Sequence, residues 1–240
     1  MSRTAPKAPH GTVLVVTAHP DDAEFGAGGT LAMWRATGAE VVLCICTSGE
    51  AGEGALDGPE LAAIRRREQL DAAALLGIDD VRFLDHPDGM VVADLILRRD
   101  ISRVIRQVRP HRVLTHCPTP DWSHIAACHP DHLAVGTAAA AAVYPDSRSS
   151  RAHPELRAQG LEPWTVPELW MMTPPATAEN TAMDVTDFVD IKLRALAAHS
   201  SQFDDSREVD AVARFQMRQA AARHEMPGRF AEVFQAVRSA

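Results

Sequence analysis

The sequence predicts an α/β fold, a Rossmann-like three-layer sandwich with a mostly parallel sheet. Continuous apolar runs alternate along the chain with segments of helical pattern. Such runs are typical of strands buried on both faces, and strand–helix alternation is typical of parallel sheets. With 240 residues, of which 46% are hydrophobic, the chain is long enough to bury a sizeable core. We therefore expect a single domain over residues 1–240, with residues 1–10 flexible.

The predicted strands are short runs rich in Val, Ile and Leu, each bounded by polar or turn residues. In chain order they cover residues 12–18, 40–48, 80–85, 111–116 and 167–173.

The predicted helices carry start and stop signals. The second begins at Pro59 and ends at Gly77, with proline at its start and glycine just past its end. The first is opened by glycines and closed at Gly38, and the third must stop near Pro110. The tail after Val209 is expected to be mostly helical, and disorder is expected over residues 144–160. The first helix covers residues 28–38 and the third covers part of 91–110. Two later helices are predicted over residues 132–143 and 185–203.

Composition argues against several classes of protein. The net charge is −8 and the arginines are scattered, which excludes nucleic acid or an anionic membrane as the main partner. No apolar stretch approaches the roughly 20 residues of a membrane span, and the first residues lack the apolar core of a secretion signal. Four cysteines do not make a disulfide framework, so we expect a reducing cytoplasm.

Histidine-rich loops follow two of the predicted strands. The motif His-Pro-Asp-Asp, residues 19–22, follows the first strand, and His116 ends a later one. In open parallel sheets ligands bind beyond the carboxyl ends of the strands. Both loops are therefore predicted on the ligand side.

His19, Asp22 and His132 are the candidate metal ligands. His19 and Asp22 lie three residues apart in a tight loop, and a second motif, His-Pro-Asp-His at 129–132, can reach the same edge. Two histidines and one carboxylate leave a position on tetrahedral zinc open for water, which is the catalytic pattern. The alternative is that Asp22 caps the next helix and His19 fills a polar niche.

Asp21 is the candidate general base. Zinc lowers the pKa of bound water to about 7, and a neighbouring carboxylate can then take the proton. His129 and Asp131 form a second candidate pair, in which an imidazole oriented by a carboxylate stabilises an oxyanion or protonates a leaving amine. The alternatives are a surface turn for Asp21 and a helix cap for Asp131.

The cysteines could form a structural zinc site and the glycines a dinucleotide-binding loop, but neither pattern fits well. A structural zinc site from residues 116, 117, 124, 128 and 129 lacks the usual C-x2-C spacing. Cys44 and Cys46 share one face of an apolar strand and are most simply core residues. The glycines near residue 28 do not fit a dinucleotide-binding motif and are expected to permit close backbone approach beside the metal loop.

Several motifs together carry a family resemblance. "AHPDDAEFGAGGTLA", the later "HPDH" and "HSSQ" at 199–202 resemble the PIG-L/LmbE-like family of zinc-dependent de-N-acetylases. "TSGEAGEG", "IRRREQLDAAALLG" and "FLDHPDG" agree with it, so the resemblance extends from about Val13 to Gln202. It implies a Rossmann-like fold and hydrolysis of an N-acetyl group, usually on a glucosamine unit.

The resemblance also implies residue roles. His19, Asp22 and His132 become metal ligands, Asp21 the base, and His129, supported by Asp131, the acid or electrophile. Arg65 and Asp88 match positions that contact the sugar, and His199 matches a histidine near the site. The alternatives are a surface pair of Arg65 with Glu68, a turn residue at Asp88 and a structural histidine on a helix at His199.

The segment 117–128 departs from the family pattern, which leaves the identity of the substrate open. Its Trp122 stacks on a sugar ring or anchors the loop, and its His124 has no counterpart in the pattern. The expected cofactor is Zn²⁺, with Fe²⁺ as the alternative, and the expected partner is a small N-acetylated amino sugar. An amidase acting on a thiol-sugar conjugate and a non-catalytic sugar- or metal-binding protein are the competing functions. A homo-oligomer is compatible with the sequence.

Overall fold

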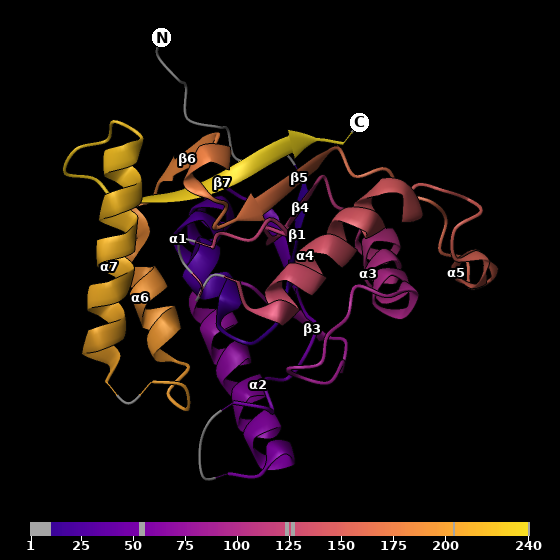
Figure 1. Cartoon of the computed structure of the whole chain (residues 1–240), viewed down its shortest axis with the longest axis horizontal. Helices are drawn as coiled ribbons and strands as arrows, with labels where there is room; N and C mark the ends of the chain where they lie inside the picture. Colours follow the sequence, from indigo (N-terminus) through magenta and orange to yellow (C-terminus); the bar gives the residue numbers. More distant parts are fainter. Residues whose placement is uncertain (1–10, 53–55, 123–124, 126–127, 204, 240) are drawn as a thin grey trace.

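The computed structural model describes residues 11–52, 56–122, 125, 128–203 and 205–239. Its centre is a seven-stranded sheet of order β3-β2-β1-β4-β5-β7-β6 (Figure 1). The strands are β1 (Thr12–Thr17), β2 (Glu40–Ile45), β3 (Asp80–Phe83), β4 (Arg112–His116), β5 (Glu168–Met172), β6 (Thr181–Asp184) and β7 (Ala231–Arg238).

The first five strands run parallel, and β7 runs antiparallel to both of its neighbours, β5 and β6. The sheet is therefore mostly parallel, as predicted. Residues 13–16 of β1 are fully buried, which explains why that strand reads as a continuous apolar run.

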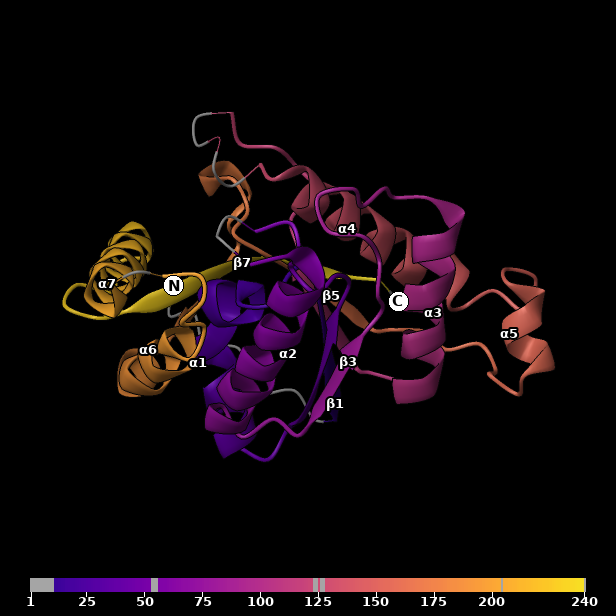
Figure 2. The ribbon, with the colours of Figure 1, turned by 90° about the horizontal axis from the view of Figure 1, so that it is seen from below.

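Helices cover both faces of the sheet. Figure 2 shows α1, α2, α6 and α7 on one side and α3 and α4 on the other. Each side encloses its own apolar cluster, one around Leu31 and Trp34, the other around Ile101 and Ile105. The predicted three-layer fold is confirmed. The helices are α1 (Asp22–Ala36), α2 (Gly58–Leu75), α3 (Leu95–Val108), α4 (Pro130–Ala141), α5 (Pro154–Ala158), α6 (Val189–Ala197) and α7 (Ser206–Arg223).

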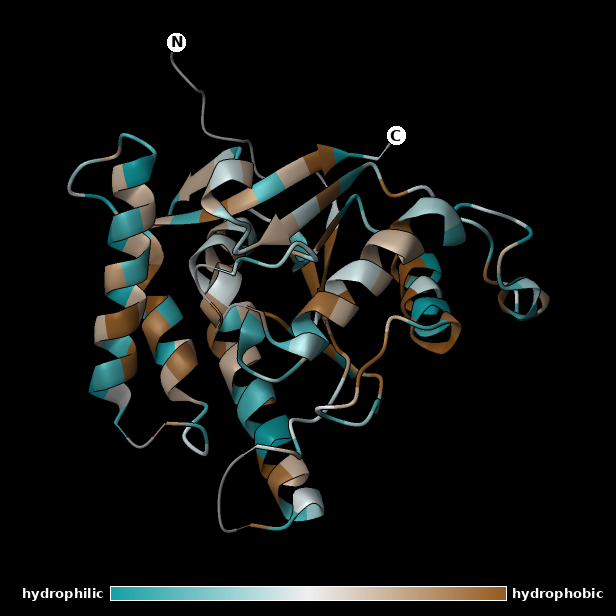
Figure 3. Cartoon of the chain, in the orientation of Figure 1, coloured by the Kyte–Doolittle hydropathy of each residue, from teal (hydrophilic) through white to brown (hydrophobic). Residues whose placement is uncertain are grey.

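Hydropathy follows this layering. In Figure 3 the hydrophobic colours concentrate on the inner strands, whereas outward-facing turns of α2 and α7 are hydrophilic. Within the described residues no helix is both long enough and apolar enough to cross a bilayer.

Helix α1 begins at Asp22, six residues before the predicted start at Gly28. The glycines lie inside the helix because other elements press against it. A Cβ on Gly26 would lie 2.6 Å from Met172 Sδ, and one on Gly29 would lie 2.8 Å from Val185 Cβ. The close backbone approach that we expected is therefore made to β5 and to the chain before α6, and not beside the metal loop.

A buried ion pair is inserted into the middle of α1. Lys192 of α6 and Glu232 of β7 lie 2.6 Å apart, and each side chain is 3% exposed. Lys192 Nζ donates to the carbonyl of Phe25 at 2.7 Å, while Glu232 accepts from the amides of Gly29 at 2.9 Å and Thr30 at 2.7 Å. In a regular helix the carbonyl of residue 25 bonds the amide of residue 29. The ion pair therefore engages the two groups of this bond from outside the helix.

Two predictions about the rest of the chain are wrong. The tail after Val209 is not mostly helical, because α7 ends at Arg223 and the chain then forms strand β7. Residues 144–160 were expected to be disordered, but the guanidinium of Arg106 donates to the carbonyls of Asp146, Ser149 and Ala152 at 2.9–3.0 Å. This buried arginine therefore supplies hydrogen-bond donors to the backbone carbonyls of a loop that has few apolar residues of its own. Residues 1–10 lie outside the described residues.

Candidate active site

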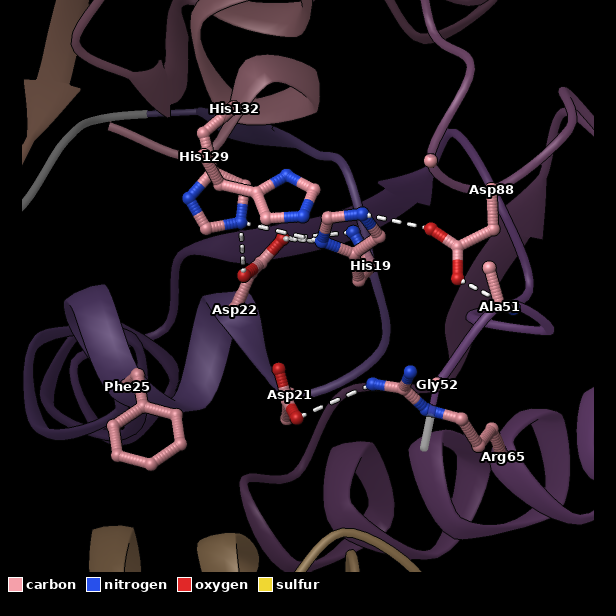
Figure 4. A pocket seen from close by; sticks show the side chains of 11 residues that line it. His19, Asp21, Asp22, Phe25, Ala51, Gly52, Arg65, Asp88, His129 and His132 are labelled. Carbon is pink, nitrogen blue, oxygen red and sulfur yellow. Dashed lines mark hydrogen bonds and ion pairs between the residues drawn. The ribbon is translucent and has the colours of Figure 1, made fainter. Parts of the chain in front are cut away.

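The predicted site residues gather at the carboxyl edge of the parallel strands (Figure 4). His19 lies two residues past β1, and Asp88 lies in the loop after β3. Asp22 opens α1, and His132 lies in the first turn of α4. They line a cavity of about 470 Å³ together with Asp21, Phe25, Ala51, Gly52, Arg65, Gly89 and His129.

His19, Asp22 and His132 converge on one point. His132 Nε2 lies 3.2 Å from His19 Nδ1 and 3.0 Å from Asp22 Oδ1. His19 Nδ1 lies 3.5 Å from Asp22 Oδ2. Ligand atoms at about 2.0–2.2 Å from a tetrahedral zinc ion lie roughly 3.3–3.6 Å apart. The spacing of the three donors therefore fits one divalent metal ion.

Two carboxylates contact Nε2 of His19, the ring nitrogen that does not face His132. His19 Nε2 lies 2.9 Å from Asp88 Oδ1 and 3.2 Å from Asp131 Oδ2. A proton on Nε2 leaves Nδ1 free as a ligand, which is how a carboxylate usually orients a metal-binding histidine. Asp131 also accepts from the amides of Gly89 at 2.8 Å and Val91 at 3.2 Å, so it ties α4 to the loop after β3.

The predicted support of His129 by the Asp131 carboxylate is not what the structure shows. His129 Nδ1 accepts from the backbone amide of Asp131 at 3.2 Å, while the carboxylate faces His19. Burial, together with nearby His19 and His132, lowers the pKa of His129. The ring is then neutral near pH 7, and an accepting Nδ1 places its proton on Nε2. His129 is thereby prepared as a hydrogen-bond donor at the rim of the cavity.

The carboxylates around His19 and His132 favour a positive charge at the point where these side chains meet. Burial lowers the pKa of His19, but hydrogen bonds with Asp22 and Asp88 outweigh it and raise that pKa to about 11. Burial would raise the pKa of Asp22, but His132 and His116 hold it well below its usual range. A divalent cation would meet the same field of carboxylates.

Asp21 occupies an unusual backbone position. Its φ is 90°, in the left-handed region, and its side chain makes no capping bond to α1. Burial and the charge of Asp22 raise the pKa of Asp21 to about 7, against the lowering effect of Arg65. A carboxylate with such a pKa, beside a metal site, is suited to take a proton near neutral pH.

Arg65 does not form the surface pair with Glu68 that was the alternative interpretation. It is 5% exposed and donates to Pro20 O at 2.8 Å, Gly49 O at 3.0 Å and Asp21 Oδ2 at 3.3 Å. Both Arg65 and Asp88 line the cavity, as expected for residues near a substrate. Each is already engaged by protein groups: Arg65 contacts Asp21, the candidate base, and Asp88 contacts His19, a candidate ligand.

Two other predicted contacts are not brought to the cavity. His199 is fully buried beside Glu24, follows α6 instead of lying on a helix, and is not among the residues that line the cavity. Trp122 is 74% exposed and is not among the residues that line the cavity. His124 lies outside the described residues.

The cysteine-based zinc site has no support among the described residues. Their candidate metal-binding groups contain only histidines and aspartates. Cys128 Sγ donates to Asp121 O at 3.3 Å, and Cys44 and Cys46 are buried in the core as predicted.

Sequence reasoning gave no role in this site to three of its residues, although it placed one of them, His116, on the ligand side. His116 stacks on His132 with ring centroids 4.1 Å apart, and its Nε2 lies 3.1 Å from Asp22 Oδ2. Its position at the end of a strand was the available signal. Gln69 and Phe25 carry no signal of chemistry, and only the fold brings them to Asp21 and the cavity.

A Rossmann-like sheet whose carboxyl edge gathers two imidazoles and two neighbouring carboxylates, with donors spaced for one divalent metal, is the arrangement expected of a metal-dependent hydrolase. The comparison with known families makes this specific. The PIG-L family, described as GlcNAc-PI de-N-acetylase, matches residues 14–143, more than half of the chain. The chain belongs to this family.

Named relatives and a solved structure agree. A diacetylchitobiose deacetylase of Thermococcus kodakarensis is 33% identical over 195 residues, covering 80% of this chain and 70% of the relative. A 1D-myo-inositol 2-acetamido-2-deoxy-alpha-D-glucopyranoside deacetylase of Rhodococcus erythropolis is 31% identical, covering 79% and 80%. The structure of an N,N'-diacetylchitobiose deacetylase from Pyrococcus horikoshii matches with a TM-score of 0.86 at 28% identity, covering 94% of this chain and 83% of that one.

Proposed function

We propose that this protein is a zinc-dependent N-deacetylase that hydrolyses the acetamide of an N-acetylglucosamine-type substrate to acetate and a free amine. The observation that carries the proposal is the convergence of His19, Asp22 and His132 within 3.0–3.5 Å, with the carboxylate of Asp21 beside them. The family, and relatives named as deacetylases of acetamido sugars, support the reaction and the substrate class.

The donor set fits a divalent metal with a catalytic role. His19, Asp22 and His132 would hold it, and the cavity leaves space on its open side. When bound, such a metal supplies Lewis acidity that polarises an amide carbonyl and makes a water molecule more acidic. Two nitrogens and one carboxylate suit Zn²⁺ and also Fe²⁺, so metal analysis must decide between them.

The chain's own residues then move the protons. Asp21 accepts a proton from the water that attacks the amide carbon. His129, neutral with its proton on Nε2, donates a hydrogen bond to the oxygen of the tetrahedral intermediate. Protonated Asp21 gives its proton to the amide nitrogen as the C–N bond breaks, so acetate and the amine leave and Asp21 is restored.

The cavity suits a small, polar substrate. Its volume of about 470 Å³ lies within the range for ligand sites, and most of its larger lining side chains are polar. Arg65, Asp88 and Gly52 lie on the side of the cavity opposite Phe25 (Figure 4). We place the sugar hydroxyls on this polar side. The four cysteines are free thiols, which supports a cytoplasmic location.

The first experiment measures metal content and acid release on the same preparations. We expect about one equivalent of metal in the wild type, its loss in Asp22→Ala, and its retention in the Cys117→Ala/Cys128→Ala variant. N-acetylglucosamine, diacetylchitobiose and a thiol-sugar conjugate are then tested for acetate, larger acids and free amine.

Each outcome separates the functions. Acetate with an equal amount of amine supports deacetylation, and release of a larger acid from the conjugate makes the protein an amidase on the same site. Metal that binds without hydrolysis of any amide makes it a binding protein. Loss of metal in the Cys117→Ala/Cys128→Ala variant overturns the proposal. So does the absence of bound metal after reconstitution with Zn²⁺ and Fe²⁺.

A further inference from the structure

Helix α2 carries three buried polar side chains, two of which bond residues at the start of α1. Arg65, Glu68 and Gln69 are 5%, 7% and 0% exposed, and their spacing of three and four residues places them on one helix face. The mechanism above uses only Arg65, so the roles of Glu68 and Gln69 need an explanation.

Gln69 joins α2 to the backbone of Asp21. Its Oε1 accepts from the amide of Asp21 at 3.0 Å, and its Nε2 donates to Glu24 Oε1 at 2.9 Å. A carboxylate can only accept hydrogen bonds, so the NH₂ group must face Glu24 and the carbonyl must face Asp21. Glu24 thus sets the orientation of the Gln69 amide.

Glu24 is held in turn by the chain after α6. Its Oε2 lies 3.6 Å from Nε2 of His199, and both side chains are fully buried. Glu68 places that turn, since it accepts from Ser200 Oγ at 2.9 Å, from Ser201 N at 2.7 Å and from Ser201 Oγ at 2.6 Å. A continuous chain of contacts therefore runs from His199 through Glu24 and Gln69 to Asp21.

Asp21 is the residue that needs such support. Its φ of 90° is a conformation that non-glycine residues rarely hold without help from their surroundings. Its side chain makes no cap bond, so it stays available to the cavity while α2 holds the residue at two points, the amide through Gln69 and the carboxylate through Arg65.

We propose that Gln69 is a positioning residue, which fixes the backbone of Asp21 so that its carboxylate faces the attacking water, and that Glu24 and His199 fix the orientation of Gln69. The inference rests on the proposed function in one respect, that Asp21 is the base. Gln69 is not a lining residue of the cavity, and its effect passes through Asp21.

The test compares four variants with the wild type, each loaded with metal. Gln69→Leu removes both hydrogen bonds at similar volume. Gln69→Glu keeps the acceptor for Asp21 but places a carboxylate against Glu24. The double variant Gln69→Glu/Glu24→Gln restores the chain with donor and acceptor exchanged. Gln107→Leu, which removes the 3.0 Å bond from Arg82 to a side chain on α3, is the matched control.

We expect Gln69→Leu and Gln69→Glu to lower kcat roughly 10- to 100-fold, since small displacements of a catalytic group have effects of this size. KM should change less than about twofold and metal content should stay at the wild-type value, because the ligands and the cavity walls are untouched. The double variant should recover kcat to within about threefold of the wild type, and the control should match the wild type throughout.

Other results overturn the inference. Wild-type kcat in both single variants, even with lowered thermal stability, would show that Gln69 has only a structural role. A double variant as slow as Gln69→Glu would remove Glu24 as the orienting group. Asp21→Asn is assayed alongside. If it is as active as the wild type, or the wild type hydrolyses no amide, the proposed function fails, whereas an inactive Asp21→Asn with active Gln69 variants overturns this inference alone.

Discussion

Asp21 is the residue on which the proposed chemistry depends most directly. It lies next to the proposed metal ligand Asp22 in sequence and lines the same cavity, and Arg65 Nη2 lies 3.3 Å from its carboxylate. Its pKa of about 7 describes a group that can both accept and return a proton near neutrality.

Asp21→Asn should keep the metal and lose roughly 10²–10⁴-fold in kcat, because asparagine preserves the shape and removes the base. Acetate release and metal content per chain measure the two effects. Asp71→Asn, at a half-exposed position on α2, is the control and should be fully active. Wild-type turnover in Asp21→Asn would assign the base to another group.

His199 should make stability depend on pH. Burial lowers its pKa, but Glu24, Asp21 and Glu68 outweigh this and raise the folded-state pKa above the ordinary value of about 6.5. The stabilisation is then fully present below about pH 6.5 and is lost as the pH rises through the folded-state pKa.

His199→Gln should therefore lose most stability at pH 6 and progressively less at pH 8 and 9. Urea midpoints of the wild type and the variant over this range give the difference. A difference that is constant with pH would show that His199 is not charged in the folded state.

The sequence predicted which residues could form the site, but it did not predict most of the contacts between them. His19, Asp22 and His132 could be proposed as ligands, and the structure brings them together, because metal ligands must be of a few types and two short motifs supply them. Contacts such as Asp131 with His19, or Gln69 with Asp21, join residues 112 and 48 positions apart and depend on how α4 and α2 pack. The local sequence pattern does not predict contacts between residues so far apart.

At the scale of elements, α4 brings His129, Asp131 and His132 to the sheet through a close approach. A Cβ on Gly136 would lie 2.5 Å from the carbonyl oxygen of His116 and 3.1 Å from Pro118 N, both of them backbone atoms. Backbone at the end of β4 cannot move aside as a flexible side chain can. Gly136, one turn after His132, thus sets the distance between α4 and β4.

Gly136→Ala should destabilise the fold by about 1–3 kcal/mol, as overpacking does, even though alanine favours the helix. It should also weaken metal binding, because α4 carries His132 away from His19. Chemical unfolding and metal titration measure both effects. Gly58→Ala, where the nearest neighbour would be at 3.4 Å, is the control. Equal stability and metal affinity in the two variants would contradict this account.

Element prediction worked where one face or one strand is continuously apolar, as in the five parallel strands. It failed where polar groups are buried by distant partners. Strand β7 contains Glu232, whose carboxylate is buried only because α1 and α6 supply its partners. The start of α1 was misplaced because the glycines that suggest an opening loop are packing contacts.

For the whole molecule, the Lys192–Glu232 pair links α6, β7 and α1. Lys192→Met should cost about 3–5 kcal/mol, because it leaves a buried carboxylate without its counter-charge. Lys192→Met/Glu232→Gln should be less destabilised, since the neutral amide oxygen still accepts from one of the α1 amides. Denaturant midpoints of the two variants test this, and a loss below about 1 kcal/mol in Lys192→Met would show that the pair is not buried as described.

The ion pair packed against the middle of helix α1 also bears on how the chain matures during synthesis. Gly29 and its acceptor Glu232 are separated by 203 positions, so the ribosome has long released α1 before the carboxylate exists. Folding that proceeds from the N-terminus forms this helix before the carboxylate that bonds the amides of its middle turn is available. The helix that begins at Asp22, a proposed metal ligand, therefore gains these contacts late, and a nascent chain stalled before Glu232 should bind metal more weakly than the finished protein.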